Sequence, residues 1–184
     1  MKTTVMKTRN KTYDLVITAM FAVLIALCSW ISVPSAVPFT LQTFGVFAAV
    51  GILGGKRGTA AVLIYILMGA VGIPVFAGFS GGIGILAGST GGYVVGFLGL
   101  ALVMWGAERM FGRKFWVLLV SMVLGLIVCY AFGTAWYMAV YLKETGAVSL
   151  GAVLMGCVVP FIIPDLIKIA LALALSRRLY RYVQ

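Results

Sequence analysis

The chain has 184 residues, of which 63% are hydrophobic and 10% charged, and its formal net charge is +10. A soluble domain of this length cannot bury so much apolar surface, and the apolar runs are each near the roughly 20 residues that span a bilayer. The composition therefore excludes a soluble protein and predicts an all-α membrane protein. Positive charge is also typical of nucleic-acid binding, but membrane topology accounts for it here, so we expect no nucleic-acid partner.

Residue types that carry catalysis and metal binding are scarce. The sequence has no histidine, and Cys28, Cys129 and Cys157 lie within apolar runs without the spacing of metal ligands. We interpret the three cysteines as small core residues. The sequence also offers no plausible nucleophile–base pair, which disfavours an intramembrane enzyme. We therefore expect no enzymatic activity, no metal and no cofactor.

The N-terminal region combines a basic lead with an apolar helix. Residues 1–11 carry four lysine or arginine side chains, and we predict the first transmembrane helix over residues 13–33. One face of this helix carries Ala19, Ala22 and Ala26. Small residues let another helix approach closely in lipid. Packing within the protein itself is the simplest interpretation of these alanines.

A connection with two prolines follows, because proline interrupts a helix. Gln42 and Thr43 then place hydrogen-bonding groups beside apolar side chains. We predict a short second helix over residues 41–53 and a third over residues 58–71.

The most unusual segment is residues 72–92, which contains eight glycines and no charged residue. Loops of this length are uncommon without a function, and glycine permits close backbone approach to a ligand. We predict a folded external cap here. Ser89 and Thr90 open a fourth helix, expected to end near residue 107; hydroxyl side chains cap helices, and free N–H groups there can hold an anion. The segment lacks a Gly-Lys-Ser/Thr phosphate loop, so it does not support ATP binding.

The predicted fifth helix, residues 115–142, ends in aromatic side chains. Trp136, Tyr137 and Tyr141 lie in its last turns. Aromatic residues at a helix end are typical of the membrane–water interface. Anchoring at that interface and packing on a ligand ring are both open interpretations.

The predicted sixth helix, residues 149–175, carries an acid and a base at bilayer depth. A charged side chain there costs at least about 2.5 kcal/mol and usually marks a functional site. Phe161, Asp165 and Lys168 follow the spacing i, i+4 and i+7, so they share one face, and two prolines before the acid should loosen the helix. The alternative is that Asp165 and Lys168 only neutralise each other inside the bundle.

The charges also predict the topology. Basic side chains cluster in residues 1–11, 56–57, 109–114 and 177–181, and the alternate connections carry none except Lys143, which lies beside Glu144. Positive charge favours the cytoplasmic side. We therefore expect residues 1–184 to form a single membrane domain with six transmembrane helices and both termini in the cytoplasm.

Five segments together resemble the BioY family, the biotin-specific S components of energy-coupling-factor transporters. They are residues 38–43 (PFTLQT), 72–78 (GIPVFAG), 89–93 (STGGY), 133–136 (GTAW) and 160–168 (PFIIPDLIK). The resemblance implies an S-component bundle with a Gly-rich outer loop, in the cell membrane of a prokaryote. It implies high-affinity capture of biotin and delivery to a transmembrane coupling subunit driven by two ABC ATPases.

The resemblance also implies roles for particular residues. Small residues of the first helix would face the coupling subunit, which points to Ala19, Ala22 and Ala26 and replaces the packing interpretation above. Phe79 stands where the family pattern has a smaller residue and adds bulk to the Gly-rich loop. With Tyr93, Trp136 and Tyr137, Phe79 is a candidate for packing on the biotin rings.

Biotin offers a ureido group with two N–H donors and a carbonyl, an apolar sulfur ring and a carboxylate tail. Because Asp165 and Lys168 are three residues apart, their polar groups should lie within a few ångströms. We expect both to serve the ureido group. The carboxylate would then lie against Gln42 and Thr43 or against Ser89 and Thr90. The competing arrangement pairs Lys168 with the carboxylate and leaves Asp165 as its counter-ion.

An ion- or proton-coupled secondary transporter is the other functional class. Such a protein could use an intramembrane acid–base pair as a relay. The six predicted spans show no clear internal repeat of the kind that such folds use. The sequence therefore favours the vitamin-capture interpretation.

Overall fold

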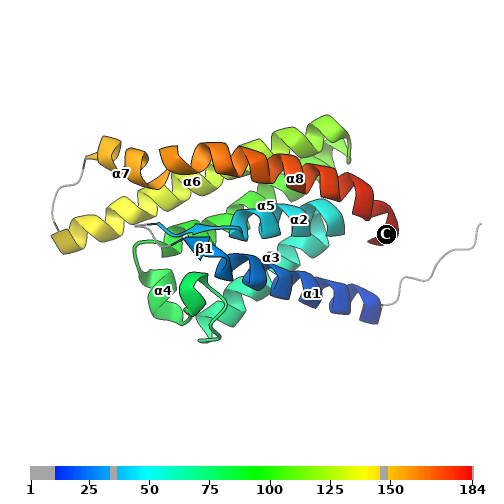
Figure 1. Cartoon of the computed structure of the whole chain (residues 1–184). Helices are drawn as coiled ribbons and strands as arrows, with labels where there is room; N and C mark the ends of the chain where they lie inside the picture. The colour runs from blue at the N-terminus through cyan, green and yellow to red at the C-terminus, as the bar shows by residue number, and fades with distance from the viewer. Residues whose placement is uncertain (1–10, 34–36, 146–148, 184) are drawn as a thin grey trace, which may run out of the picture.

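The computed structural model describes residues 11–33, 37–145 and 149–183. Long helices run side by side along one direction, with short elements gathered at one end of the bundle (Figure 1). The α-helices are α1 (Lys11–Trp30), α2 (Gln42–Leu53), α3 (Gly55–Ala70), α4 (Ile83–Ala87), α5 (Gly91–Phe111), α6 (Phe115–Thr145), α7 (Leu150–Cys157) and α8 (Val159–Val183). The short elements also include the antiparallel pair β1 (Ser32–Val33) and β2 (Phe39–Thr40) and the 3-10 turn η1 (Ala77–Phe79).

Four segments of the described chain are long and apolar enough to cross a membrane, which makes this a multi-pass membrane protein. They are α1, α5, most of α6, and α7 together with α8. The helices α2 and α3 have only 12 and 16 residues. At a rise of about 1.5 Å per residue they fall short of the roughly 30 Å hydrocarbon core. The predicted count of six spans is therefore not confirmed by helix length.

Short α2 is the centre of the bundle. Nearly every residue of α2 is buried, and α2 packs against α1, α3, α5 and α8. A helix that is apolar all round is expected in such a position. Its N-terminus carries Gln42 and Thr43 into the interior, where both are buried.

The predicted sixth helix is two helices. The chain breaks at Val158, where φ is −125° and ψ is −56°. Pro160 follows in the first turn of α8, where its missing N–H needs no partner, and Pro164 lies inside the helix. Helix α8 then continues to Val183, beyond the predicted end at residue 175. The expected disruption near the prolines is present, but it precedes both of them.

The described residues of the basic clusters lie at one end of the bundle, where α1 and α3 begin and α5 and α8 end (Figure 1). Arg57 donates to the Asp14 carboxylate at 3.1 Å and to the Val183 carbonyl at 3.4 Å. Arg113 pairs with Glu108 at 3.3 Å, and its guanidinium lies 3.7 Å from the centre of the Tyr180 ring. The charges that the sequence assigns to one side of the membrane are thus gathered on one side of the molecule.

The Gly-rich segment is folded at the opposite end, together with β1 and β2. It contains η1 and α4, and two indoles tie it to the long helices. Trp30 donates to the Pro74 carbonyl at 2.9 Å, and Trp136 donates to the Gly88 carbonyl at 3.0 Å. Gly78 and Gly82 have φ of 68° and 100°, values that glycine adopts without strain.

Candidate functional site

A cavity of about 170 Å³ lies near the folded cap, between α2, α5, α6 and α8. A buried water needs only about 10–15 Å³, so the cavity has room for a small organic molecule. Its lining comes from segments far apart in the sequence and is mostly apolar. The residues that line it are Val37, Pro38, Thr40, Gln42, Thr43, Phe76, Ala77, Ser80, Ile85, Thr90, Tyr93, Val94, Phe97, Cys129, Tyr130, Cys157, Phe161, Asp165 and Lys168.

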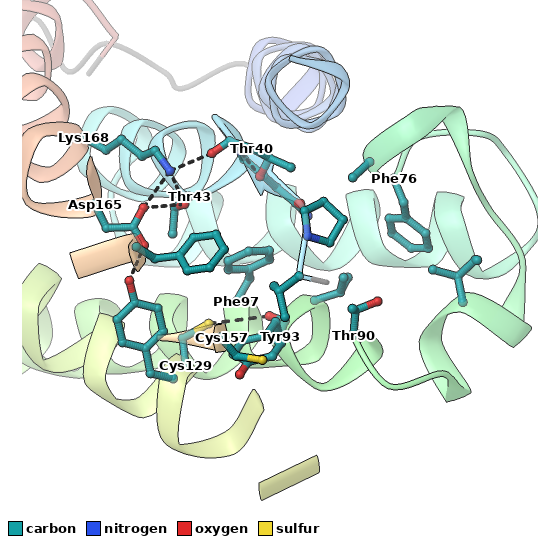
Figure 2. Close-up of a pocket in the computed structure, with 18 of the residues that line it drawn as sticks. Thr40, Thr43, Phe76, Thr90, Tyr93, Phe97, Cys129, Cys157, Asp165 and Lys168 are labelled. Carbon is teal, nitrogen blue, oxygen red and sulfur yellow. Dashed lines mark hydrogen bonds and ion pairs between the residues drawn. The ribbon is translucent and has the colours of Figure 1, made fainter. Parts of the chain in front are cut away.

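Lys168 is the centre of a buried ionic group at one end of the cavity (Figure 2). Its Nζ atom donates to Asp165 Oδ1 at 2.7 Å, to the Thr40 carbonyl at 2.6 Å and to Thr43 Oγ1 at 3.3 Å. It also lies 4.6 Å from the centre of the Phe39 ring. An ammonium has three N–H donors, so the protein already uses all of them. The base is therefore held in a fixed position before any ligand enters.

Asp165 is held from both sides. Its Oδ1 atom accepts from Lys168 and from the Thr43 hydroxyl at 3.2 Å, and its Oδ2 atom accepts from the Tyr130 hydroxyl at 2.5 Å. Only 2% of Asp165 is exposed. A carboxylate has about four acceptor positions, so it can accept one further N–H without losing a partner.

Aromatic rings surround the rest of the cavity. Tyr93 and Phe97 of α5 and Phe161 of α8 line it, and the Tyr93 hydroxyl lies 3.2 Å from the Thr134 hydroxyl. In Figure 2, Phe76 and Thr90 lie on the side away from the ionic group. The cavity therefore combines a charged end, an apolar aromatic middle and a hydroxyl at the far side.

The structure brings most of the predicted binding residues together. Those that line the cavity are Gln42, Thr43, Thr90, Tyr93, Phe161, Asp165 and Lys168. The predicted shared face of α8 is confirmed, because Phe161, Asp165 and Lys168 are all buried. The predicted closeness of the acid and base is confirmed by their 2.7 Å contact.

Four predicted binding residues lie outside the cavity lining: Ser89, Phe79, Trp136 and Tyr137. Phe79 is 64% exposed and stacks on Trp30 with ring centres 4.9 Å apart. Trp136 uses its indole N–H on the Gly88 carbonyl and so holds the Gly-rich segment in place. Phe79 and Trp136 thus fasten the cap rather than line the cavity.

Thr43 lies beside Asp165 and Lys168, at the charged end of the cavity. Because its hydroxyl bonds to both side chains, it is part of the ionic group. Gln42 already uses one amide N–H within the protein, because its Nε2 atom donates to the Tyr65 hydroxyl at 2.7 Å. Of the residues proposed for the carboxylate, Thr90 is the one on the far side of the cavity.

Tyr130 is the main site residue that the sequence interpretation missed. It lies in an apolar stretch of α6, 35 positions from Asp165. A buried tyrosine hydroxyl usually needs a partner, and that is the signal that could have pointed to it. The Thr40 carbonyl could not have been found from side-chain chemistry.

Two of the three alanines expected on the partner face of the first helix are buried. Ala22 and Ala26 are 1% and 3% exposed and belong to the hydrophobic core. They let α1 pack closely on α2 and α3, so packing within the protein accounts for these two alanines, and a partner contact through them stays a prediction. Ala19 is exposed, and its contact with a partner stays a prediction.

We therefore expect Ala22→Trp to destabilise the folded protein. Forcing a large ring into a packed core typically costs about 1–3 kcal/mol or more, so the melting temperature and the yield of folded protein should both fall. Ala19→Trp is the matched control, because its ring would extend from the exposed face of the same helix. A variant Ala22→Trp that melts like the parent would contradict this packing role.

Comparison with known proteins gives a consistent result over the whole chain. The sequence model of the BioY family matches residues 1–184. "Biotin transporter BioY" of Thermotoga maritima is 42% identical over 169 residues, covering 90% of this chain and 95% of the relative. "Probable biotin transporter BioY" of Pyrococcus horikoshii is 40% identical, covering 92% and 97%. The crystal structure of "the S-component for biotin from an ECF-type ABC transporter" superposes with a TM-score of 0.83 at 26% identity, covering 96% and 95%.

Proposed function

This chain belongs to the BioY family, and we propose that it captures biotin in the cavity between α2, α5, α6 and α8 for uptake by an energy-coupling-factor transporter. The observation that carries the proposal is the buried ionic group at one end of a mostly apolar, ligand-sized cavity. The relatives named as biotin transporters and the biotin S component of the same fold support it. The function is transport, not catalysis.

The ureido group of biotin binds at the ionic group. Asp165 accepts a ureido N–H with its remaining acceptor capacity, since Lys168, Thr43 and Tyr130 use only three of its acceptor positions. Lys168 can donate to the ureido carbonyl only by exchanging one of its present partners, of which the Thr43 hydroxyl at 3.3 Å is the longest contact. Lys168 would then make the same number of hydrogen bonds with biotin bound as without it. This matters because a buried donor without a partner is costly.

The remainder of biotin extends away from the ionic group. Its sulfur ring packs among Tyr93, Phe97 and Phe161, which line the apolar middle. Its carboxylate lies toward Thr90, where the 21-residue helix α5 begins; the N-terminus of a helix favours an anion. The competing arrangement reverses the ligand, so that Lys168 pairs with the carboxylate.

The position of the charges supports an orientation in the membrane. The end with Arg57 and Arg113 faces the cytoplasm, as do both termini, and the segment over residues 72–92 caps the outer side. Six spans then include short α2 and α3, and residues 1–184 act as one domain in the plasma membrane of a prokaryote. The sequence carries no Gly-Lys-Ser/Thr phosphate loop, so energised uptake needs a transmembrane coupling subunit and two ABC ATPases as partners.

The test is biotin handling by the purified chain without ATPases. In liposomes with an imposed ion gradient, we expect biotin to bind to the chain but not to accumulate inside. Scintillation counting of the vesicle interior and of bound label separates the two. Robust accumulation under these conditions would favour the ion-coupled alternative and contradict a capture-only role.

A further inference from the structure

A second cavity, a groove of about 820 Å³, lies at the charged end of the bundle, away from the biotin cavity. Residues from the starts of α1 and α3, the end of α5 and the last turn of α8 line it, and Figure 1 shows that these parts of the four helices lie at the same end of the bundle. The residues that line it are Lys11, Asp14, Leu15, Thr18, Leu53, Gly54, Gly55, Lys56, Arg57, Ala60, Ile64, Trp105, Glu108, Arg109 and Tyr180.

The groove has an excess of positive charge. Its two carboxylates are both engaged, because Asp14 pairs with Arg57 at 3.1 Å and Glu108 pairs with Arg113 at 3.3 Å. Glu108 also accepts from the Gly55 N–H at 2.7 Å. Three further cations line the groove without a hydrogen bond or ion pair among the described residues: Lys11, Lys56 and Arg109.

Arg57 adds a buried donor without an acceptor. The residue is 9% exposed, its Nη1 atom is used by Asp14 and Val183, and its Nη2 atom is buried with no hydrogen-bond partner in the part of the chain that the structure describes. An unsatisfied buried donor costs about 1–3 kcal/mol, and more when it is charged. Within the described residues, the floor of the groove therefore lacks an anionic acceptor for this donor.

None of the acidic side chains in the sequence is left to supply that acceptor. Its four acidic side chains are the two in the groove, Asp165 in the biotin cavity, and Glu144. Glu144 is one residue from the end of α6, a 31-residue helix that starts at the charged end. Residues 1–10 contain lysine and arginine but no acidic residue. We propose that the groove binds an anionic phospholipid, with its phosphodiester among Lys56, Arg57 and Arg109.

The apolar wall of the groove favours a lipid over free phosphate. Leu15 and Ile64 are 71% and 36% exposed on α1 and α3, which pack against each other, and they offer an acyl chain a path along the two helices. Trp105 and Tyr180 line the same groove, and such rings are typical of the level of lipid headgroups. Basic pockets between membrane helices on the cytoplasmic side are suited to anionic headgroups.

Native mass spectrometry of the delipidated chain, titrated with phosphatidylglycerol or phosphatidylcholine, tests the site. We expect phosphatidylglycerol to bind more tightly. The double variant Lys56→Gln/Arg109→Gln should weaken phosphatidylglycerol binding about twenty-five-fold, since each basic residue near an anionic headgroup contributes about fivefold. The matched control Arg178→Gln/Arg181→Gln removes two exposed charges from α8 outside the groove and should leave binding within about twofold.

Biotin affinity should be unchanged in both double variants, which shows that they are folded. If the control variant weakens phosphatidylglycerol binding as much as the groove variant does, the lipid is attracted by diffuse surface charge, and the groove is not its binding site. Displacement of phosphatidylglycerol by equimolar inorganic phosphate would overturn the lipid assignment in favour of a simple anion site. Equal binding of phosphatidylcholine would also overturn it.

Discussion

Replacing Asp165 by asparagine should abolish tight biotin binding and destabilise the protein at the same time. The substitution removes the acceptor proposed for the ureido N–H and leaves the Lys168 cation buried, with 5% exposure and without its counter-ion. Breaking a buried ion pair costs about 3–5 kcal/mol, and loss of a buried charged contact to a ligand costs at least about 2 kcal/mol, or about thirtyfold in affinity. Thermal melting and equilibrium binding measure the two effects separately.

The double variant Asp165→Asn/Lys168→Met distinguishes a binding role from simple neutralisation. Removing both charges leaves no unpaired ion, and such replacements are often neutral for stability. We therefore expect the melting temperature to recover most of the loss while biotin affinity stays low. If Asp165 and Lys168 only neutralise each other, the double variant should bind biotin as the parent does, and that result would remove both residues from the binding site.

Replacing Lys168 alone should weaken biotin and biotin methyl ester by the same factor. In the proposed arrangement Lys168 serves the ureido carbonyl, which is identical in the two ligands, so Lys168→Met should cost each about tenfold to a hundredfold. Isothermal titration calorimetry with both ligands measures the loss of affinity for each, and the two losses can then be compared. A larger loss for the free acid than for the ester would show that Lys168 pairs with the carboxylate.

The variant Thr90→Val tests the other end of the ligand by the same comparison of biotin with its methyl ester. Thr90 lies on the far side of the cavity from the ionic group (Figure 2). Hydrogen bonds to a charged acceptor are stronger than those to a neutral one. The loss of its hydroxyl should therefore weaken the free acid more than the ester. If Thr90→Val leaves the affinity for the free acid unchanged, the carboxylate binds elsewhere.

Much of this architecture follows from the periodicity and charge of the sequence. The apolar runs marked α1, α5 and α6 to within a few residues, because a span of the bilayer fixes their length, but they missed the break at Val158 and the extension of α8 to Val183. The helical period placed Phe161, Asp165 and Lys168 on one face, and burial of all three confirms it. The contact of Arg57 with Asp14 shows that clusters far apart in the chain lie at the same end of the molecule.

Other features depend on tertiary contacts that a sequence does not encode locally. Small residues such as Ala22 permit close helix packing, but their spacing does not say whether the second helix belongs to the same chain. The Gly-rich segment could be recognised from composition, whereas the turn of Phe79 toward Trp30 depends on its folded path. Tyr130 reaches Asp165 only because α6 and α8 both border the cavity.

The central claim is that the cavity recognises the ureido end of biotin. Native mass spectrometry of the purified chain, with biotin alone and in competition, tests it most directly. We predict one biotin per chain, displaced by desthiobiotin, which keeps the ureido group and the carboxylate, and not by lipoate, which has a carboxylate and a sulfur ring but no ureido group. A folded chain that binds no biotin, or that exchanges biotin for lipoate as readily as for desthiobiotin, would contradict the account.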